Sequence, residues 1–121
     1  MKKSQFLLVC LLFLMGCIKE SQTQYAIDEN QAYLVITQNT TQEELEKIAA
    51  AFKEQKNIDI DYSKSKFSKN GKISDVSLEV DCNDGFKGST QCSESALKFQ
   101  NIGFVRDYQS GSAITFHIGS M

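Results

Sequence analysis

The chain has 121 residues, a net charge of −2 and 41% hydrophobic residues. That length and composition suit one small domain with a single core. A mildly acidic chain lacks the clustered basic surface that nucleic-acid binding needs, so we exclude DNA and RNA as partners.

An apolar run opens the chain. Lys2 and Lys3 precede an uncharged stretch from Phe6 to Met15. As a helix, this stretch would extend about 15 Å, half the thickness of a bilayer core, so it is too short to span a membrane. A basic start, a short apolar run and a small residue at its end are typical of a secretory signal peptide.

The run ends at Leu14-Met15-Gly16-Cys17, which resembles a bacterial lipobox. The resemblance implies cleavage after residue 16 and a diacylglycerol thioether on Cys17. We therefore expect residues 1–16 to be a lipoprotein signal peptide. Because two or more acyl chains anchor a protein stably, we expect the mature protein to be held in the bacterial envelope by lipid. Ile18 replaces the Asp that often signals inner-membrane retention, which favours the outer membrane. The alternative is an ordinary signal peptide with a chance cysteine.

The mature chain begins with a polar, unpatterned segment. Residues 17–31 predict a flexible tether with a reach of roughly 20 Å, followed by a single domain over residues 32–121. Cys10 would be removed with the signal peptide and Cys17 would carry the lipid, so Cys82 and Cys92 are the remaining cysteines. Two such residues usually join outside the cytoplasm, so we expect a disulfide between them. A zinc site is the rival interpretation, but it lacks further thiols.

The first elements of the domain follow from local patterns. Residues 32–38 are apolar on both faces, which predicts an interior strand. Thr41 and Glu44 have the spacing of a capping box, and Asn57 can adopt the left-handed turn that ends a helix. Between them an apolar stripe has helical spacing: Leu45, Ile48, Ala49 and Phe52.

A hairpin is predicted next. A two-residue turn at Asn70-Gly71 would set Ile60 opposite Asp81, placing a core residue against an acid. A three-residue loop over 69–71, with Gly71 left-handed, instead pairs Ile60 with Val80 and buries one clean face. We therefore predict the three-residue loop.

Two further strands are expected in the tail. The segment ALKFQNIGFV (96–105) predicts a strand with a bulge near residues 101–103. In SAITFHI (112–118), alternation places Ile114, Phe116 and Ile118 inward and His117 at the surface. The predicted fold is α+β and two-layer, with one helix packed on a largely antiparallel sheet in the order β-α-β-β-β-β.

Residues 33–82 resemble an extracellular module of bacterial envelope proteins. The marks are the Asn-Thr-Thr helix start at 39–41 and the Asn-Gly-Lys-Ile turn at 70–73. The module occurs in small lipoproteins and in the C-terminal region of sensor-type membrane metallopeptidases of the β-lactam-sensor class. The resemblance implies a shared fold. It implies no protease activity, because the peptidase's His-Glu-x-x-His motif is absent.

One acidic cluster stands out. The predicted register sets Asp59 opposite Asp81 and Asp61 opposite Glu79, on the face away from the helix. Like charges opposed on a sheet are destabilising. The four carboxylates therefore have three interpretations: they bind Ca²⁺, they meet a basic partner, or they are simply solvated near the lysines of the hairpin.

No catalytic constellation is present in the sequence. We expect no cofactor other than Ca²⁺ at the acidic cluster, and the predicted partners are the membrane, through the lipid anchor, and an envelope protein. The predicted function is therefore a non-enzymatic lipoprotein that binds a partner or ligand. The alternative is an inhibitor, or an enzyme acting on envelope or secreted substrates, which would need a cleft lined by Asp81, Asp84 and His117.

Overall fold

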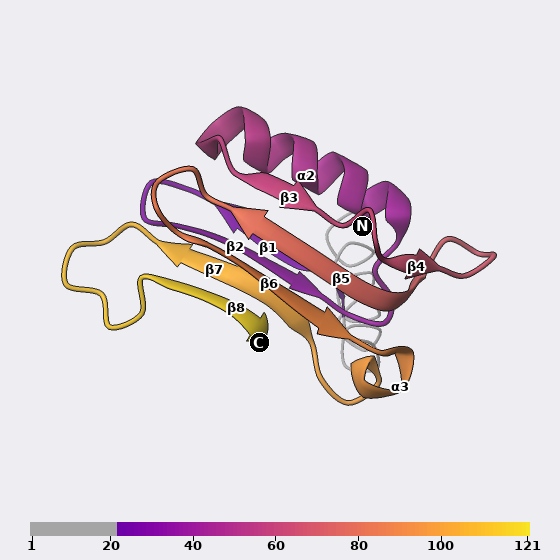
Figure 1. Ribbon diagram of the computed structural model, residues 1–121. Coiled ribbons are helices and arrows are strands. Elements are labelled where there is room, and N and C mark those ends of the chain that lie inside the picture. The colour runs from indigo at the N-terminus through magenta and orange to yellow at the C-terminus, as the bar shows by residue number, and fades with distance from the viewer. Residues whose placement is uncertain (1–21) are drawn as a thin grey trace, which may run out of the picture.

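The computed structural model describes residues 22–121 as a mixed α+β structure with one main helix and two antiparallel sheets (Figure 1). The predicted signal peptide and Cys17 lie outside the described residues. Within residues 22–121, no helix has both the length and the apolar character needed to cross a bilayer.

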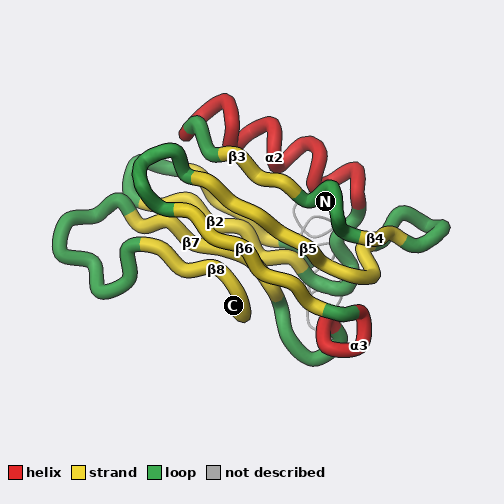
Figure 2. Tube along the Cα trace, viewed as in Figure 1, coloured by secondary structure: helices red, strands yellow, loops and turns green. Residues whose placement is uncertain are grey.

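Each sheet has four strands, and the two sheets differ in order (Figure 2). The first sheet runs β1-β2-β7-β8, with bounds Gln24–Ile27, Gln31–Ile36, Ile102–Asp107 and Phe116–Ser120. The second has β5 (Ile73–Asp81) in its centre, with β3 (Asp59–Asp61) and β4 (Lys66–Phe67) along one edge and β6 (Lys87–Cys92) along the other. The helices are α2 (Gln42–Lys56) and the short α3 (Glu94–Leu97). The predicted order β-α-β-β-β-β therefore omitted β1, β6 and α3, and it counted β3 and β4 as one strand.

The main helix forms as predicted. The Thr41 hydroxyl accepts a hydrogen bond from the Glu44 amide at 3.1 Å, and the Glu44 carboxylate accepts one from the Thr41 amide at 3.0 Å. This capping box satisfies two amides that the first helical turn leaves without partners. At the other end, Asn57 takes the left-handed conformation with φ 55°. The predicted helix and both of its boundary signals are confirmed.

The hairpin register is also confirmed. Ile60 pairs with Val80, between the pairs Asp59 with Asp81 and Asp61 with Glu79. The Ser68 amide donates to the Lys72 carbonyl at 2.8 Å, which closes a three-residue loop. Gly71 has φ 85°, a conformation that costs glycine little and other residues more.

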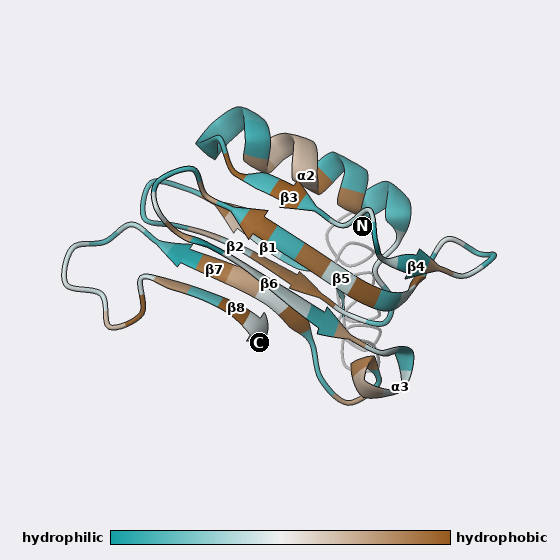
Figure 3. Cartoon of the chain, in the orientation of Figure 1, coloured by the Kyte–Doolittle hydropathy of each residue, from teal (hydrophilic) through white to brown (hydrophobic). Residues whose placement is uncertain are grey.

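The core lies where α2 and the buried faces of both sheets meet. Phe52 on α2 contacts Phe104 on β7, with ring centroids 5.3 Å apart. The hydrophobic bands in Figure 3 follow the strand alternation that directs every second side chain inward. The strand residues buried in this core include Leu34, Ile36, Val76, Leu78, Val80, Ile102 and Phe104.

The predicted tether is wrong over its second half. Residues 24–27 form β1, which pairs with β2 from Gln24 opposite Val35 to Ile27 opposite Ala32. Tyr25 contacts Phe52 with ring centroids 6.3 Å apart. Ordered structure therefore begins ahead of residue 32, because two apolar side chains in a four-residue edge strand are enough to pack against a helix.

The predicted disulfide is not formed. Cys92 pairs with Val76 near the start of β5, whereas Cys82 follows the end of that strand and donates its amide to the Phe86 carbonyl at 2.9 Å. Six residue steps along the strand, from 76 to 82, separate those two positions by about 20 Å, and a disulfide needs Cα atoms within about 7 Å. Both thiols are free and buried. The prediction missed β6, which runs antiparallel to β5 and places Cys92 at the opposite end of that strand from Cys82.

The tail departs from its predicted form in three places. Residues 94–97 are helical rather than extended. The Ser93 hydroxyl accepts a hydrogen bond from the Ala96 amide and so caps the first turn of this helix. The pairing of β7 with β2 is continuous, without the predicted bulge. Ile114 precedes β8 and is 59% exposed, whereas Phe116 and Ile118 pack against the core as expected.

Candidate functional site

The four predicted carboxylates lie on the outer face of the sheet formed by β3, β5 and β6, which we call the acidic face. The register that opposes Asp59 to Asp81 and Asp61 to Glu79 brings all four together. They line a shallow hollow of about 530 Å³. The rest of its lining is Val80, Lys87, Gly88 and Ser89. This part of the site was predicted from the sequence.

Three of the four carboxylates accept hydrogen bonds, and Asp59 has two side-chain donors beside it. Asp59 accepts bonds from the Asn83 amide group at 2.9 Å and from the Lys53 ammonium at 2.8 Å. These donors, Asn83 first, hold the pKa of Asp59 below its ordinary value of 3.8. Lys53 belongs to α2, so one side chain of the helix reaches Asp59 at the edge of this face.

Asp61 and Asp81 are held by local turns. The Ser63 hydroxyl and amide both donate to Asp61, at 2.6 and 2.9 Å, and lower its pKa. The Asn83 amide donates to Asp81 at 2.9 Å, and the register places Lys87 directly across from Asp81. Carboxylates with lowered pKa values are weak bases near neutral pH, so this face suits the binding of cationic groups better than proton transfer.

The described residues contain no group of three or more His, Cys, Asp or Glu side chains arranged to hold a metal ion. Asp59, Asp61 and Asp81 each accept hydrogen bonds from donors of their own, so they do not converge on a common point. The Ca²⁺ interpretation stays a prediction.

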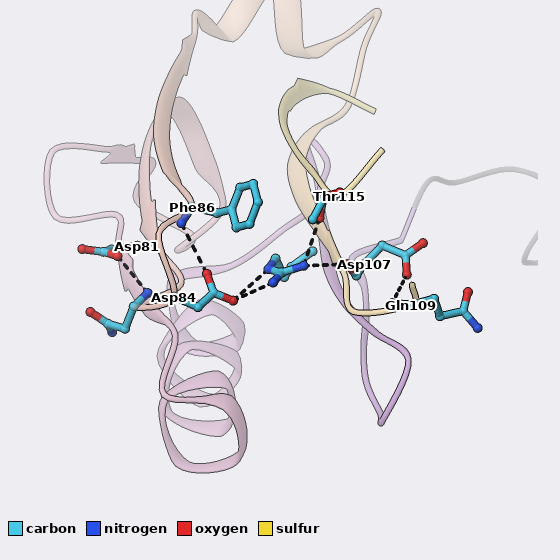
Figure 4. Close-up of polar contacts among 8 residues, drawn as sticks. Asp81, Asp84, Phe86, Asp107, Gln109 and Thr115 are labelled. Carbon is cyan, nitrogen blue, oxygen red and sulfur yellow. Dashed lines mark hydrogen bonds and ion pairs between the residues drawn. The ribbon is translucent and has the colours of Figure 1, made fainter. Parts of the chain in front are cut away.

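A second cluster was missed by the sequence analysis. Arg106, the only arginine of the chain, donates from Nε and Nη2 to Asp84 at 2.9 and 2.8 Å (Figure 4). Its guanidinium lies 4.6 Å from the ring centroids of both Phe86 and Tyr108. We call these four residues the Arg106 cluster. No local pattern reveals it, because its members come from separate segments.

The Arg106 cluster joins three segments. Arg106 Nη1 donates to the carbonyls of Asp107 at 2.5 Å and Thr115 at 3.4 Å, while Asp84 lies in the loop between β5 and β6. The Arg106 side chain is 11% exposed, so its charge is paired with little water between the partners. The geometry indicates a structural role: this cluster fastens the β5–β6 loop to β7 and to the residues before β8.

The residues of the alternative catalytic cleft are not brought together. Asp84 pairs with Arg106, and Asp81 lines the acidic face. His117 is exposed, as predicted, and its Nε2 lies 2.9 Å from the Ser120 carbonyl. It borders a different hollow, beside Val105 on the outer face of the first sheet.

The buried thiols are not arranged as nucleophiles. Burial, and then the nearby Asp84 charge, raise the pKa of Cys82 to about 11, so the thiol keeps its proton near neutral pH. The Cys92 sulfur accepts a weak bond from the Gln100 amide group at 3.6 Å.

Comparison with known proteins gives no relative. No protein-family model, no curated protein and no solved structure matches the chain. The resemblance of residues 33–82 to an envelope module stays a prediction.

Proposed function

We propose that the chain is a non-enzymatic lipoprotein of the bacterial envelope, anchored by lipid at Cys17, whose acidic face binds a basic segment of an envelope partner. The outer membrane is the proposed location. Residues 14–17 support the anchor, because the apolar run stops at a cysteine that precedes a polar segment. The resemblance of residues 33–82 to the envelope module belongs to the same proposal, as does the two-layer packing of α2 against a sheet.

The observation that carries the binding function is the register of β3 against β5. It sets two pairs of carboxylates directly opposite each other, an arrangement that is unfavourable without a cation nearby. Among the residues that the structure describes, Lys53 alone brings an ammonium group within ion-pair distance of these acids, and it reaches Asp59. A lysine or arginine side chain of a partner would offset the remaining repulsion, and the hollow gives it room.

The anchor is tested in cells with Cys17→Ala. We expect the parent protein in the membrane fraction, with a mass increase on Cys17 from the diacylglycerol thioether, and the variant in the soluble fraction. Cys82→Ala is the matched control, and it should stay in the membrane fraction. An unmodified Cys17 thiol in the processed protein would contradict the anchor.

The binding function is tested by titrating the protein with an oligolysine peptide and following backbone amide signals by NMR. Signals from β3, β5 and β6 should shift, and added salt should reverse the shifts. The double variant Asp61→Asn, Glu79→Gln should lose the response. Glu29→Gln with Glu54→Gln removes the same charge from exposed positions elsewhere and should keep it. Equal responses in both variants would contradict the proposal.

A further inference from the structure

Three segments meet at one end of the molecule (Figure 1). β1 begins at Gln24, beside the end of β2, and Ile36 at the end of β2 pairs with Ile102 at the start of β7. The Met121 amide donates to the Asn101 carbonyl at 3.0 Å. The start of β1, the connection from α3 to β7 and the C-terminal residue therefore share this end.

This end carries an exposed aromatic side chain. Phe99, in the connection from α3 to β7, is 90% exposed. Its amide donates to the Ala96 carbonyl at 3.0 Å, which holds the backbone of the connection in a turn. Lys98 and Gln100 on either side are exposed as well. Phe99 thus contributes little to the core, and its ring would gain free energy from any apolar layer that covered it.

Lysines are concentrated at the same end. The segment from 62 to 74, which contains the β4 hairpin, has four lysines and no acidic residue: Lys64, Lys66, Lys69 and Lys72. The hairpin and α3 line a common hollow of about 150 Å³, with Lys72 on one side and Lys98 on the other. The acids near these lysines are Asp75, which pairs with Lys66 at 4.0 Å, Glu94, and Glu43 and Glu44 in the first turn of α2, which begins beside Lys72.

The chain that leads to Cys17 leaves from the same end. Seven residue steps lead from Cys17 to Gln24, which is at most about 24 Å of extended chain. A lipid on Cys17 therefore keeps the start of β1, and with it Phe99 and the lysines, close to the bilayer. An anionic lipid surface attracts lysines near it, and its headgroup layer accepts apolar side chains.

We infer that this end is a membrane-contact surface: Phe99 enters the headgroup region of an anionic bilayer, and Lys69, Lys72 and Lys98 meet its phosphates. The inference rests on the proposed lipid anchor and adds an orientation to it. The membrane-contact surface faces the bilayer, and the opposite end of the sheets points away.

A single tryptophan tests the contact. The chain has no Trp, so Phe99→Trp introduces a unique fluorophore. Residues 17–121 are coupled through the Cys17 thiol to a maleimide lipid in vesicles of phosphatidylglycerol and phosphatidylcholine, because Cys82 and Cys92 are buried. We expect the indole emission of the Phe99→Trp variant to move to shorter wavelength and to be quenched by lipids with brominated acyl chains. Ile114→Trp is the matched control: it is an exposed apolar position before the other end of β8, and its emission should not change.

Charge reversal tests the role of the lysines. With Cys17→Ser, binding of the chain to phosphatidylglycerol vesicles should weaken by about tenfold or more for Lys69→Glu and for Lys98→Glu, since each replaces an attraction worth about a fivefold change with a repulsion. Lys87→Glu, an exposed lysine of the acidic face, should leave this binding unchanged.

The outcomes separate the inference from the proposed function. An indole at position 99 that stays in water on anionic vesicles overturns the membrane-contact surface, whatever modification Cys17 carries in cells. Equal quenching of the Phe99→Trp and Ile114→Trp variants overturns it too, because the domain would then have no preferred orientation. A blue shift of the Phe99→Trp variant without vesicles, lost on dilution, would assign the surface to a second copy and overturn the lipid contact.

Discussion

At one end of the two sheets, Arg106 lies near two aromatic rings and pairs with Asp84, so a charge on β7 holds two other segments, the β5–β6 loop and the residues before β8. At the opposite end, Phe99 and the lysines of the hairpin are exposed to solvent. Both ends combine aromatic and basic side chains. Burial makes the difference: the same chemistry stabilises the fold at one end and is left available for binding at the other.

The largest effect should come from Arg106→Ala. The substitution leaves Asp84 without its two guanidinium donors and leaves the Phe86 and Tyr108 rings without the cation between them. Removing one member of such a pair costs about 2–4 kcal/mol of unfolding free energy. Urea unfolding followed by circular dichroism measures it. Arg106→Lys keeps the charge but not the planar fork, so it should lose less. A loss below that of an ordinary surface substitution would break the comparison between the ends.

High pH should weaken the same end through Cys82. Its pKa is raised, from 9.0 to about 11, so the unfolded chain loses this proton at lower pH than the folded protein does. The stability that the protonated thiol contributes is full below pH 9 and is lost as the pH rises toward 11. Two pH units correspond to about 2–3 kcal/mol. Unfolding curves measured between about pH 8 and the raised pKa should fall less steeply for Cys82→Ala. Parallel curves would contradict the assignment.

Thr41→Ala should have a smaller effect, at the end that carries the membrane-contact surface. It removes the hydroxyl that accepts the Glu44 amide and should cost about 1 kcal/mol. Thermal unfolding measures the loss, with Ser110→Ala in an exposed loop as a neutral control. A loss larger than that of Arg106→Ala would reverse the ranking of the two ends.

The smallest effect is expected for Phe99→Ser. An exposed side chain outside the core should change the unfolding free energy by less than about 0.5 kcal/mol. The same urea unfolding series provides the measurement. A clear destabilisation would show that Phe99 supports the fold, and the contrast with Arg106 would then disappear.

Local rules explain which parts of the fold could be predicted. The capping box at Thr41, the left-handed Asn57 and the alternation of Ile60 with its acidic neighbours depend on residues close in sequence. The register of β3 against β5, and with it the acidic face, followed from the requirement that one face be apolar.

The missed elements depend on distant contacts. The β6 strand has few apolar residues, and Gly88 in it packs against β8: a Cβ at Gly88 would lie 2.8 Å from the Ile118 side chain. Ile118 occupies the space that a side chain at position 88 would need, and nothing in the segment KGSTQC (87–92) indicates this contact. The disulfide prediction failed for a related reason, since the missed strand carries Cys92 along β5 and away from Cys82. Ser93 was the one local signal that could have revealed α3, because it caps that turn.

β1 begins and β8 ends at the same end of the first sheet, on its two opposite edges, about 14 Å apart across three strand spacings. When both ends of a domain lie near each other at its surface, the domain can be inserted into a loop of another protein. A reporter fused after Met121 would therefore lie at the end of the sheet that carries the proposed membrane-contact surface. The turn at 109–112 on the opposite side is the better place for a label.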